Sequence, residues 1–175
     1  ALDNTKGRIF AYDFQGNMLY AFGGHGYKAG LFMNPSAIED IGDSLLVTDQ
    51  KLGTITQFTL TDYGKMINDG LAEYKKGNYD ESANIWRKVL KHNGNYDQAY
   101  IGIGRALLRE KNYKEAMDYF ELKLDAKNYS KAFKLYREVW FEENIGTILI
   151  IIAILILLGF GVGFVKKARR EVEKG

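Results

Sequence analysis

Few side chains in this sequence are arranged for catalysis. The chain of 175 residues has two histidines, His25 and His92, which lie in different segments, and it has no cysteine. It contains no Ser-His-Asp order, no paired-histidine metal spacing and no glycine-rich phosphate loop. Carboxylates are numerous but scattered, as on solvated helix surfaces. We therefore expect no enzyme activity, no bound metal and no cofactor in this chain.

Two arginines are better placed for binding than for catalysis. Arg105 and Arg109 are four residues apart, so a helix would carry both on one face. A guanidinium group binds carboxylate oxygens in pairs, and the spacing therefore suits a carboxylate or an acidic segment. The alternative is that both arginines belong to a solvated helix face.

A long apolar run lies near the C-terminus. Residues 145–165 are 21 residues without a charge. A bilayer core of about 30 Å needs roughly 20 apolar residues in a helix, so the run predicts a transmembrane helix, with a buried core helix as the alternative. Gly159 and Gly163 are spaced for close packing of two helices in the membrane, although a plain lipid-facing anchor fits equally well.

The charges that follow this run predict its orientation. Four basic residues come directly after it, and such residues mark the cytoplasmic side of a span: Lys166, Lys167, Arg169 and Arg170. We expect a cell-membrane protein with one span, residues 166–175 in the cytoplasm and the rest outside. The net charge is only +2, and no soluble segment is basic enough to indicate nucleic acid. The expected partners are the lipid bilayer and other proteins, possible subunits of a membrane complex.

Residues 1–62 have the alternation of short strands. Strands are expected at 9–12, 18–22, 44–48 and 54–60, separated by glycine-containing turns. The stretch from Asp3 to Tyr12 aligns with that from Asp49 to Phe58 at an offset of 46 residues. A repeat of this length fits one four-stranded blade of a β-propeller.

This segment also resembles the NHL repeat family of β-propellers. The matching residues are Gly16, Phe22, Gly23, Gly26, Gly30, Phe32, Pro35, Val47, Asp49, Ile55 and Phe58. The resemblance implies the last blade of a propeller and part of the blade before it. A propeller closes with about four to eight blades, so we expect this chain to be the C-terminal part of a longer protein.

Residues 63–143 change to helical spacing and repeat at an offset of 34 residues. The repeat pairs Gly70 with Gly104, Tyr79 with Tyr113, Ser82 with Ala116 and Trp86 with Phe120. A helix–turn–helix unit of 34 residues is the period of tetratricopeptide repeats. The stretches 74–82 and 108–116 resemble that family. The small residues would let helices approach closely, and the aromatic residues would fill the space between pairs.

The tetratricopeptide resemblance implies a concave groove lined by the first helix of each pair. By the pattern of the family, that groove includes Asn68, Lys75, Arg105 and Arg109. Proteins of the family usually bind peptides or other proteins there.

The predicted fold is therefore multidomain, β followed by α. It comprises partial NHL-like propeller blades at 1–62, two tetratricopeptide-like hairpins with a closing helix at 63–143, a single transmembrane helix at 145–165 and a basic tail at 166–175. The predicted function is a membrane-anchored protein-interaction scaffold in a membrane or envelope complex, and a cysteine-free exported chain favours bacteria. The alternatives are a ligand- or carbohydrate-binding sensor and an enzyme whose active site lies in preceding blades.

Overall fold

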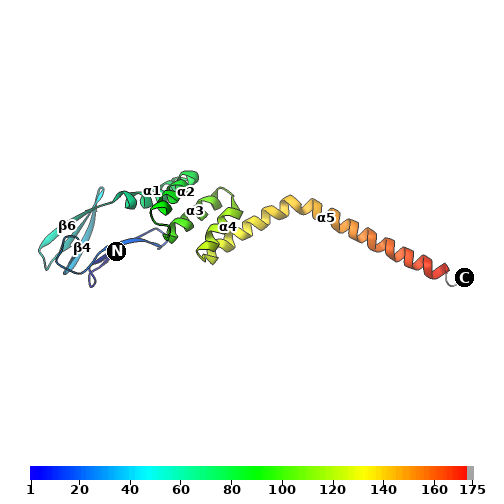
Figure 1. The fold of residues 1–175 in the computed structure, drawn as a ribbon, viewed down its shortest axis with the longest axis horizontal. Coiled ribbons are helices and arrows are strands. Elements are labelled where there is room, and N and C mark those ends of the chain that lie inside the picture. Colours follow the sequence, from blue (N-terminus) through cyan, green and yellow to red (C-terminus); the bar gives the residue numbers. More distant parts are fainter. Residues whose placement is uncertain (173–175) are drawn as a thin grey trace.

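The elements follow one another along an elongated molecule. The computed structural model describes the backbone of residues 1–172 and the side chains of residues 1–163 and of Lys166. Two small sheets at the N-terminal end are followed by a stack of helices, and a long last helix projects away from the stack (Figure 1). The predicted order of β structure and then helices is confirmed.

The strands form two antiparallel sheets of three strands each, in the orders β1-β2-β3 and β4-β5-β6. Their bounds are β1 Leu2–Asp3, β2 Arg8–Tyr12, β3 Met18–Gly23, β4 Pro35–Ile41, β5 Ser44–Asp49 and β6 Thr54–Thr59. The four strands expected from the sequence correspond to β2, β3, β5 and β6. The sequence analysis missed β1, which has two residues, and β4, which is mostly exposed on both faces and so lacks an apolar alternation.

The expected propeller blades are not what the structure contains. Each sheet has three strands where a propeller blade has four, and two such sheets do not form a propeller. After β6 the chain passes through Leu60 and Thr61 directly into a helix, and within residues 1–172 no fourth strand joins the second sheet. The 46-residue offset places β2, the central strand of the first sheet, on β6, an edge strand of the second, so it does not relate one whole sheet to the other.

A buried carboxylate organises the second sheet. Asp49 is 2% exposed, and it accepts backbone hydrogen bonds from Met33 at 2.6 Å, Asn34 at 3.1 Å, Lys51 at 2.9 Å and Leu52 at 2.9 Å. Burial alone would raise its pKa, but these four bonds favour the charged form and hold the pKa of Asp49 below its ordinary value of 3.8. The carboxylate therefore joins the segment before β4 to the turn between β5 and β6.

Five helices follow, and each packs against the next along the chain. Their bounds are α1 Asp62–Lys76, α2 Tyr79–His92, α3 Asp97–Arg109, α4 Tyr113–Leu122 and α5 Ala126–Val172. Thr61 caps α1 by accepting a hydrogen bond from the backbone of Gly64 at 3.1 Å. Gly77 ends α1 in a left-handed conformation with φ of 90°, which glycine adopts without strain.

The core of the stack depends on aromatic rings that fit against glycines. A Cβ on Gly70 would lie 2.9 Å from the ring of Trp86, and one on Gly102 would lie 2.5 Å from its Nε1. A Cβ on Gly104 would lie 2.7 Å from the ring of Phe120. Both rings are buried, so the expected close approach of helices at small residues is confirmed, and Gly102 is an addition to it.

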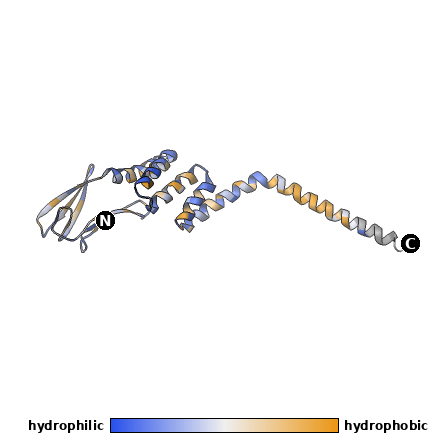
Figure 2. Ribbon diagram, in the orientation of Figure 1, coloured by the Kyte–Doolittle hydropathy of each residue, from blue (hydrophilic) through white to orange (hydrophobic). Residues whose placement is uncertain are grey.

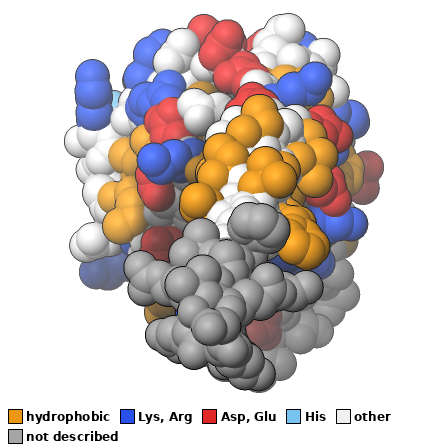
Figure 3. Space-filling view, turned by 90° about the vertical axis from the view of Figure 1, so that its right-hand side faces the viewer, with side chains coloured by type: hydrophobic (Ala, Val, Ile, Leu, Met, Phe, Trp, Pro, Cys, Tyr) orange, Lys and Arg blue, Asp and Glu red, His pale blue; other side chains and the backbone are white. Residues whose placement is uncertain are grey.

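The last helix combines two elements that the sequence analysis separated. Its start packs on the stack through Tyr129, Ala132 and Leu135, and it continues without a break through the apolar run. Among the described residues it alone is long and apolar enough to cross a membrane, and none of its most apolar stretch is buried in the protein. The apolar residues are concentrated in its second half (Figure 2), and the end-on view shows them in front of a rim of mixed charges (Figure 3).

The glycine–aromatic contacts yield a stability prediction. Gly104→Ala should lower the free energy of unfolding by about 1–3 kcal/mol, because the added methyl group overlaps the buried ring of Phe120. Gly94→Ala is the matched control, since its Cβ would meet nothing closer than the carbonyl oxygen of Leu90 at 3.8 Å. Urea unfolding of the two full-length variants in detergent measures both values, and equal losses would contradict the packing described.

Candidate partner-binding groove

The four residues predicted to line a groove lie on the expected helices. Asn68 and Lys75 belong to α1, and Arg105 and Arg109 belong to α3, the first helices of two successive pairs. The groove is not empty. The hairpin formed by β2 and β3 lies against it, and three of the four residues contact that hairpin.

The tip of the hairpin is a turn built around one carboxylate. Asp13 Oδ1 accepts hydrogen bonds from the backbone amides of Gln15 at 2.8 Å and Asn17 at 2.9 Å. Its other oxygen, Oδ2, accepts one from the Asn17 side-chain amide at 2.7 Å. Gly16, with φ of 85°, supplies the left-handed residue that closes the turn. The turn thus fixes the direction in which the carboxylate points.

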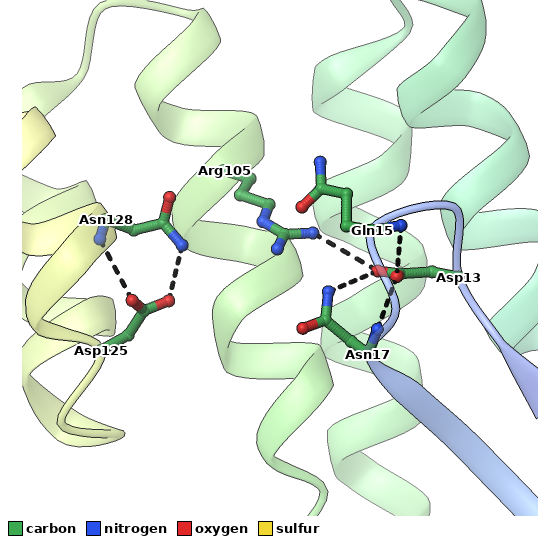
Figure 4. Close-up of polar contacts among 6 residues, drawn as sticks. All are labelled: Asp13, Gln15, Asn17, Arg105, Asp125 and Asn128. Atoms are coloured by element: carbon green, nitrogen blue, oxygen red, sulfur yellow. Dashed lines mark hydrogen bonds and ion pairs between the residues drawn. The ribbon is translucent and has the colours of Figure 1, made fainter.

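The carboxylate of the turn points to the groove arginine. Arg105 Nη1 lies 3.7 Å from Asp13 Oδ2, and the two side chains are 17% and 7% exposed (Figure 4). Burial would raise the pKa of Asp13, but the hydrogen bonds from Asn17 and Gln15 and the charge of Arg105 outweigh it and lower the pKa below 3.8. Asp13 is therefore a charged group held against a cation.

Two further groove residues, both on α1, also contact the hairpin. Lys75 Nζ lies 4.8 Å from the centroid of the Phe14 ring, a cation–π distance. The Tyr20 hydroxyl donates a long hydrogen bond of 3.4 Å to Asn68 Oδ1. Phe14 remains 96% exposed, so this contact lies at the surface of the protein.

An apolar contact that the sequence analysis missed holds the hairpin to the stack. Leu19 is 7% exposed and belongs to the same hydrophobic core as Ile67 of α1 and Ile103 of α3. Tyr96, just before α3, donates a hydrogen bond from its hydroxyl to the Leu19 carbonyl oxygen at 2.8 Å, and burial raises the pKa of Tyr96. The sequence signal for this contact was only that Leu19 lies on one face of an expected strand.

Arg109 is placed differently from Arg105. Its Nε donates a hydrogen bond to the Tyr74 hydroxyl at 3.2 Å, which raises the pKa of Arg109, and its side chain is exposed. The two arginines lie one turn apart on α3, but only Arg105 has a carboxylate of the hairpin beside it. Beyond Arg105, Asp125 accepts hydrogen bonds from the backbone and side chain of Asn128 at the start of α5 (Figure 4).

The residues predicted to act in the membrane lie on α5. Gly159 and Gly163 have open space where a Cβ would be, so they are accessible to another helix. Lys166 is exposed near the end of the helix. Lys167, Arg169 and Arg170 lie outside the residues whose side chains the structure describes, and their role in orientation stays a prediction.

A cavity lies between the two sheets and α1. Its volume is about 920 Å³, which is large enough for a ligand of small-molecule size. Aromatic side chains from both sheets line it together with acidic groups, among them Phe10, Tyr12, Phe58, Asp40 and Asp43. The hydroxyl of Tyr63, another lining residue, is buried and has no hydrogen-bond partner among the described residues.

Comparison with known proteins supports the identification of the helical repeats. Residues 68–131 match the tetratricopeptide repeat family. The match begins within α1 and ends within α5, so it covers the second part of α1, all of α2, α3 and α4, and the start of the closing helix. No match was found among curated proteins or among solved structures.

The hairpin contact yields a coupling prediction. Asp13→Asn and Arg105→Gln should each destabilise the full chain, and a double-mutant cycle should give a coupling energy of about 1 kcal/mol, because the pair is shielded from solvent. Urea unfolding in detergent measures the cycle. Asp13→Asn combined with Arg109→Gln is the control and should be additive within about 0.5 kcal/mol. Additivity in the Arg105 cycle would contradict the contact.

Proposed function

We propose that the protein is a single-pass, membrane-anchored scaffold for protein–protein interaction. Its sheets and tetratricopeptide repeats lie outside the cell, its C-terminus lies in the cytoplasm, and it serves as a component of a membrane or envelope complex. The observation that carries the proposal is the continuity of α5. Repeats similar to a family that binds proteins are joined, without a flexible linker, to an apolar helix whose most apolar stretch none of the described residues cover.

The aromatic residues before the apolar run support the membrane assignment. Trp140 and Phe141 are 42% and 48% exposed and lie just N-terminal to residue 145. Tryptophan and other aromatic rings favour the interface between lipid and water, where one end of the ring is apolar and the other is wet. Placed at that depth, α5 would hold the repeats close to the membrane surface and in a fixed orientation.

The orientation can be tested on the full chain fused behind an export signal and followed by a C-terminal tag. The protein should stay with the membrane after alkaline carbonate, and protease added to intact spheroplasts should digest residues 1–143 while the tag survives. Changing Lys166, Lys167, Arg169 and Arg170 to glutamine should reduce the fraction of molecules whose C-terminus is in the cytoplasm, because basic residues retain that end on the cytoplasmic side. Release by carbonate would refute the anchoring, and protection of the repeats would refute the orientation.

The scaffold role needs a separate measurement. A photo-crosslinking residue at position 109, in the groove, should give protein adducts in membranes of the source cells. The same residue at position 88, on the exposed face of α2, is the matched control and should give none. Adducts at both positions, or at neither, would count against a groove that selects partners.

A second candidate function is the binding of a carbohydrate in the cavity between the sheets and α1. Aromatic rings with nearby carboxylates can stack on and hydrogen-bond a sugar, and this lining contains both. The full chain in detergent should then bind a glycan array. Tyr12→Ala should abolish the signal, and Tyr27→Ala, at an exposed residue outside the lining, should not. An array without signal would reject this candidate.

A further inference from the structure

The hairpin that lies against the groove contacts the stack through the residues at and near its turn. Its contacts come from Asp13 and Phe14 at the tip, from Ala11 in β2, and from Leu19 and Tyr20 in β3. The Leu19 carbonyl oxygen also accepts the hydrogen bond from Tyr96. The described sheets are complete without the stack, because β2 and β3 pair with each other and with β1. The hairpin could therefore leave the groove without the loss of any strand pairing.

The covalent connection between the two parts is short. β6 ends at Thr59 and α1 begins at Asp62, so only Leu60 and Thr61 join the sheets to the helices. A rotation at these two residues would move the sheets as a unit and withdraw the hairpin. The groove thus has an occupant that is tethered, present at a high effective concentration, and held by contacts that can open.

The contacts of the hairpin describe what the groove recognises. Arg105 meets the carboxylate of a tight turn, and Lys75 lies over the face of the aromatic residue that follows it. An apolar side chain farther along the strand, Leu19, joins the hydrophobic core that contains Ile67 and Ile103. The recognised feature is therefore an acidic β-turn, with aspartate followed by an aromatic residue. A helix or an extended basic peptide would not offer this combination.

We propose that the groove between α1 and α3 is a docking site for an acidic β-turn of a partner protein, and that the chain's own β2–β3 hairpin occupies this site until the partner displaces it. The proposal rests on the proposed scaffold function and names the partner's chemistry. Arg109, whose described hydrogen bond is to Tyr74 and not to the hairpin, offers a partner a second guanidinium one turn farther along α3.

If the hairpin and a partner compete for the groove, mutations that weaken the hairpin contact should increase the affinity of the groove for the partner. A tethered occupant acts as a competitor at millimolar effective concentration, so the wild-type groove should bind a free turn only weakly. Substitutions that weaken the hairpin contact should strengthen binding of the free turn. A simple structural contact would give the opposite result, because loosening it would damage the groove.

The test uses the full chain in nanodiscs and a fluorescent, backbone-cyclised peptide with the sequence of residues 11–20 as the probe. The Asp13→Asn, Phe14→Ala double variant should bind this peptide about tenfold or more tightly than the wild-type chain. Adding Arg105→Gln to that variant should weaken binding about fivefold, whereas adding Lys88→Gln, on the exposed face of α2, should leave it unchanged. A peptide that carries Asp13→Asn should bind less well than the unaltered peptide.

Several outcomes would overturn the proposal. The wild-type chain and the double variant could bind the peptide with equal affinity, or the double variant could fail to bind it. The affinity of the double variant could also be unchanged by Arg105→Gln. Each of these results would contradict the proposal. Phe14→Ala alone, at a side chain that is 96% exposed, serves as a second variant should the double variant unfold.

If sedimentation shows that the double variant dimerises and that Arg105→Gln prevents it, the occupant is the hairpin of a second copy, and the external partner is excluded. The peptide assay reads the groove alone, so its failure is distinct from a failure of membrane anchoring.

Discussion

The groove depends on the position of one tryptophan. Trp86 of α2 fits between Gly70 of α1 and Gly102 of α3, where either added Cβ would lie within 2.9 Å of its side chain. The indole therefore sets the distance between the two helices that line the groove. Its ring also lies 6.4 Å from that of Tyr96, whose hydroxyl holds the Leu19 carbonyl of the hairpin. The packing that builds the repeats thus also determines what the groove can hold.

A stack built in this way couples three parts of the protein. The hairpin contacts α1 and α3, each helix packs on the next, and α5 carries the stack into the apolar run as one continuous helix. The groove is therefore connected to the apolar helix by a short series of packed helices. The junction at Leu60 and Thr61 is the one place between sheets and helices where the described chain has neither strand nor helix.

Most of the helical half could be predicted from the sequence, because its signals are local. The repeat of Gly70 at Gly104 and of Trp86 at Phe120 identified the pairs, and the uncharged run identified the apolar helix. The sheet half was harder. Strand alternation located β2, β3, β5 and β6, but the number of strands per sheet depends on where the chain turns into α1, which the 46-residue repeat does not reveal.

The groove residues were found from the family pattern. Their contact with the hairpin could not be, since Asp13 and Arg105 are paired only by the way the two halves pack, and nothing in the spacing of either residue indicates the other.

The docking of the hairpin can be measured directly, because the chain has no cysteine of its own. Cysteines in place of Phe14 and Lys75, whose side chains meet at 4.8 Å, should be joined by a short bismaleimide within one molecule of the full chain in nanodiscs. A pair at Phe14 and Lys88, on the exposed face of α2, is the control and should remain unlinked. Cross-linking of the first pair at the rate of the control would show that the hairpin does not lie in the groove.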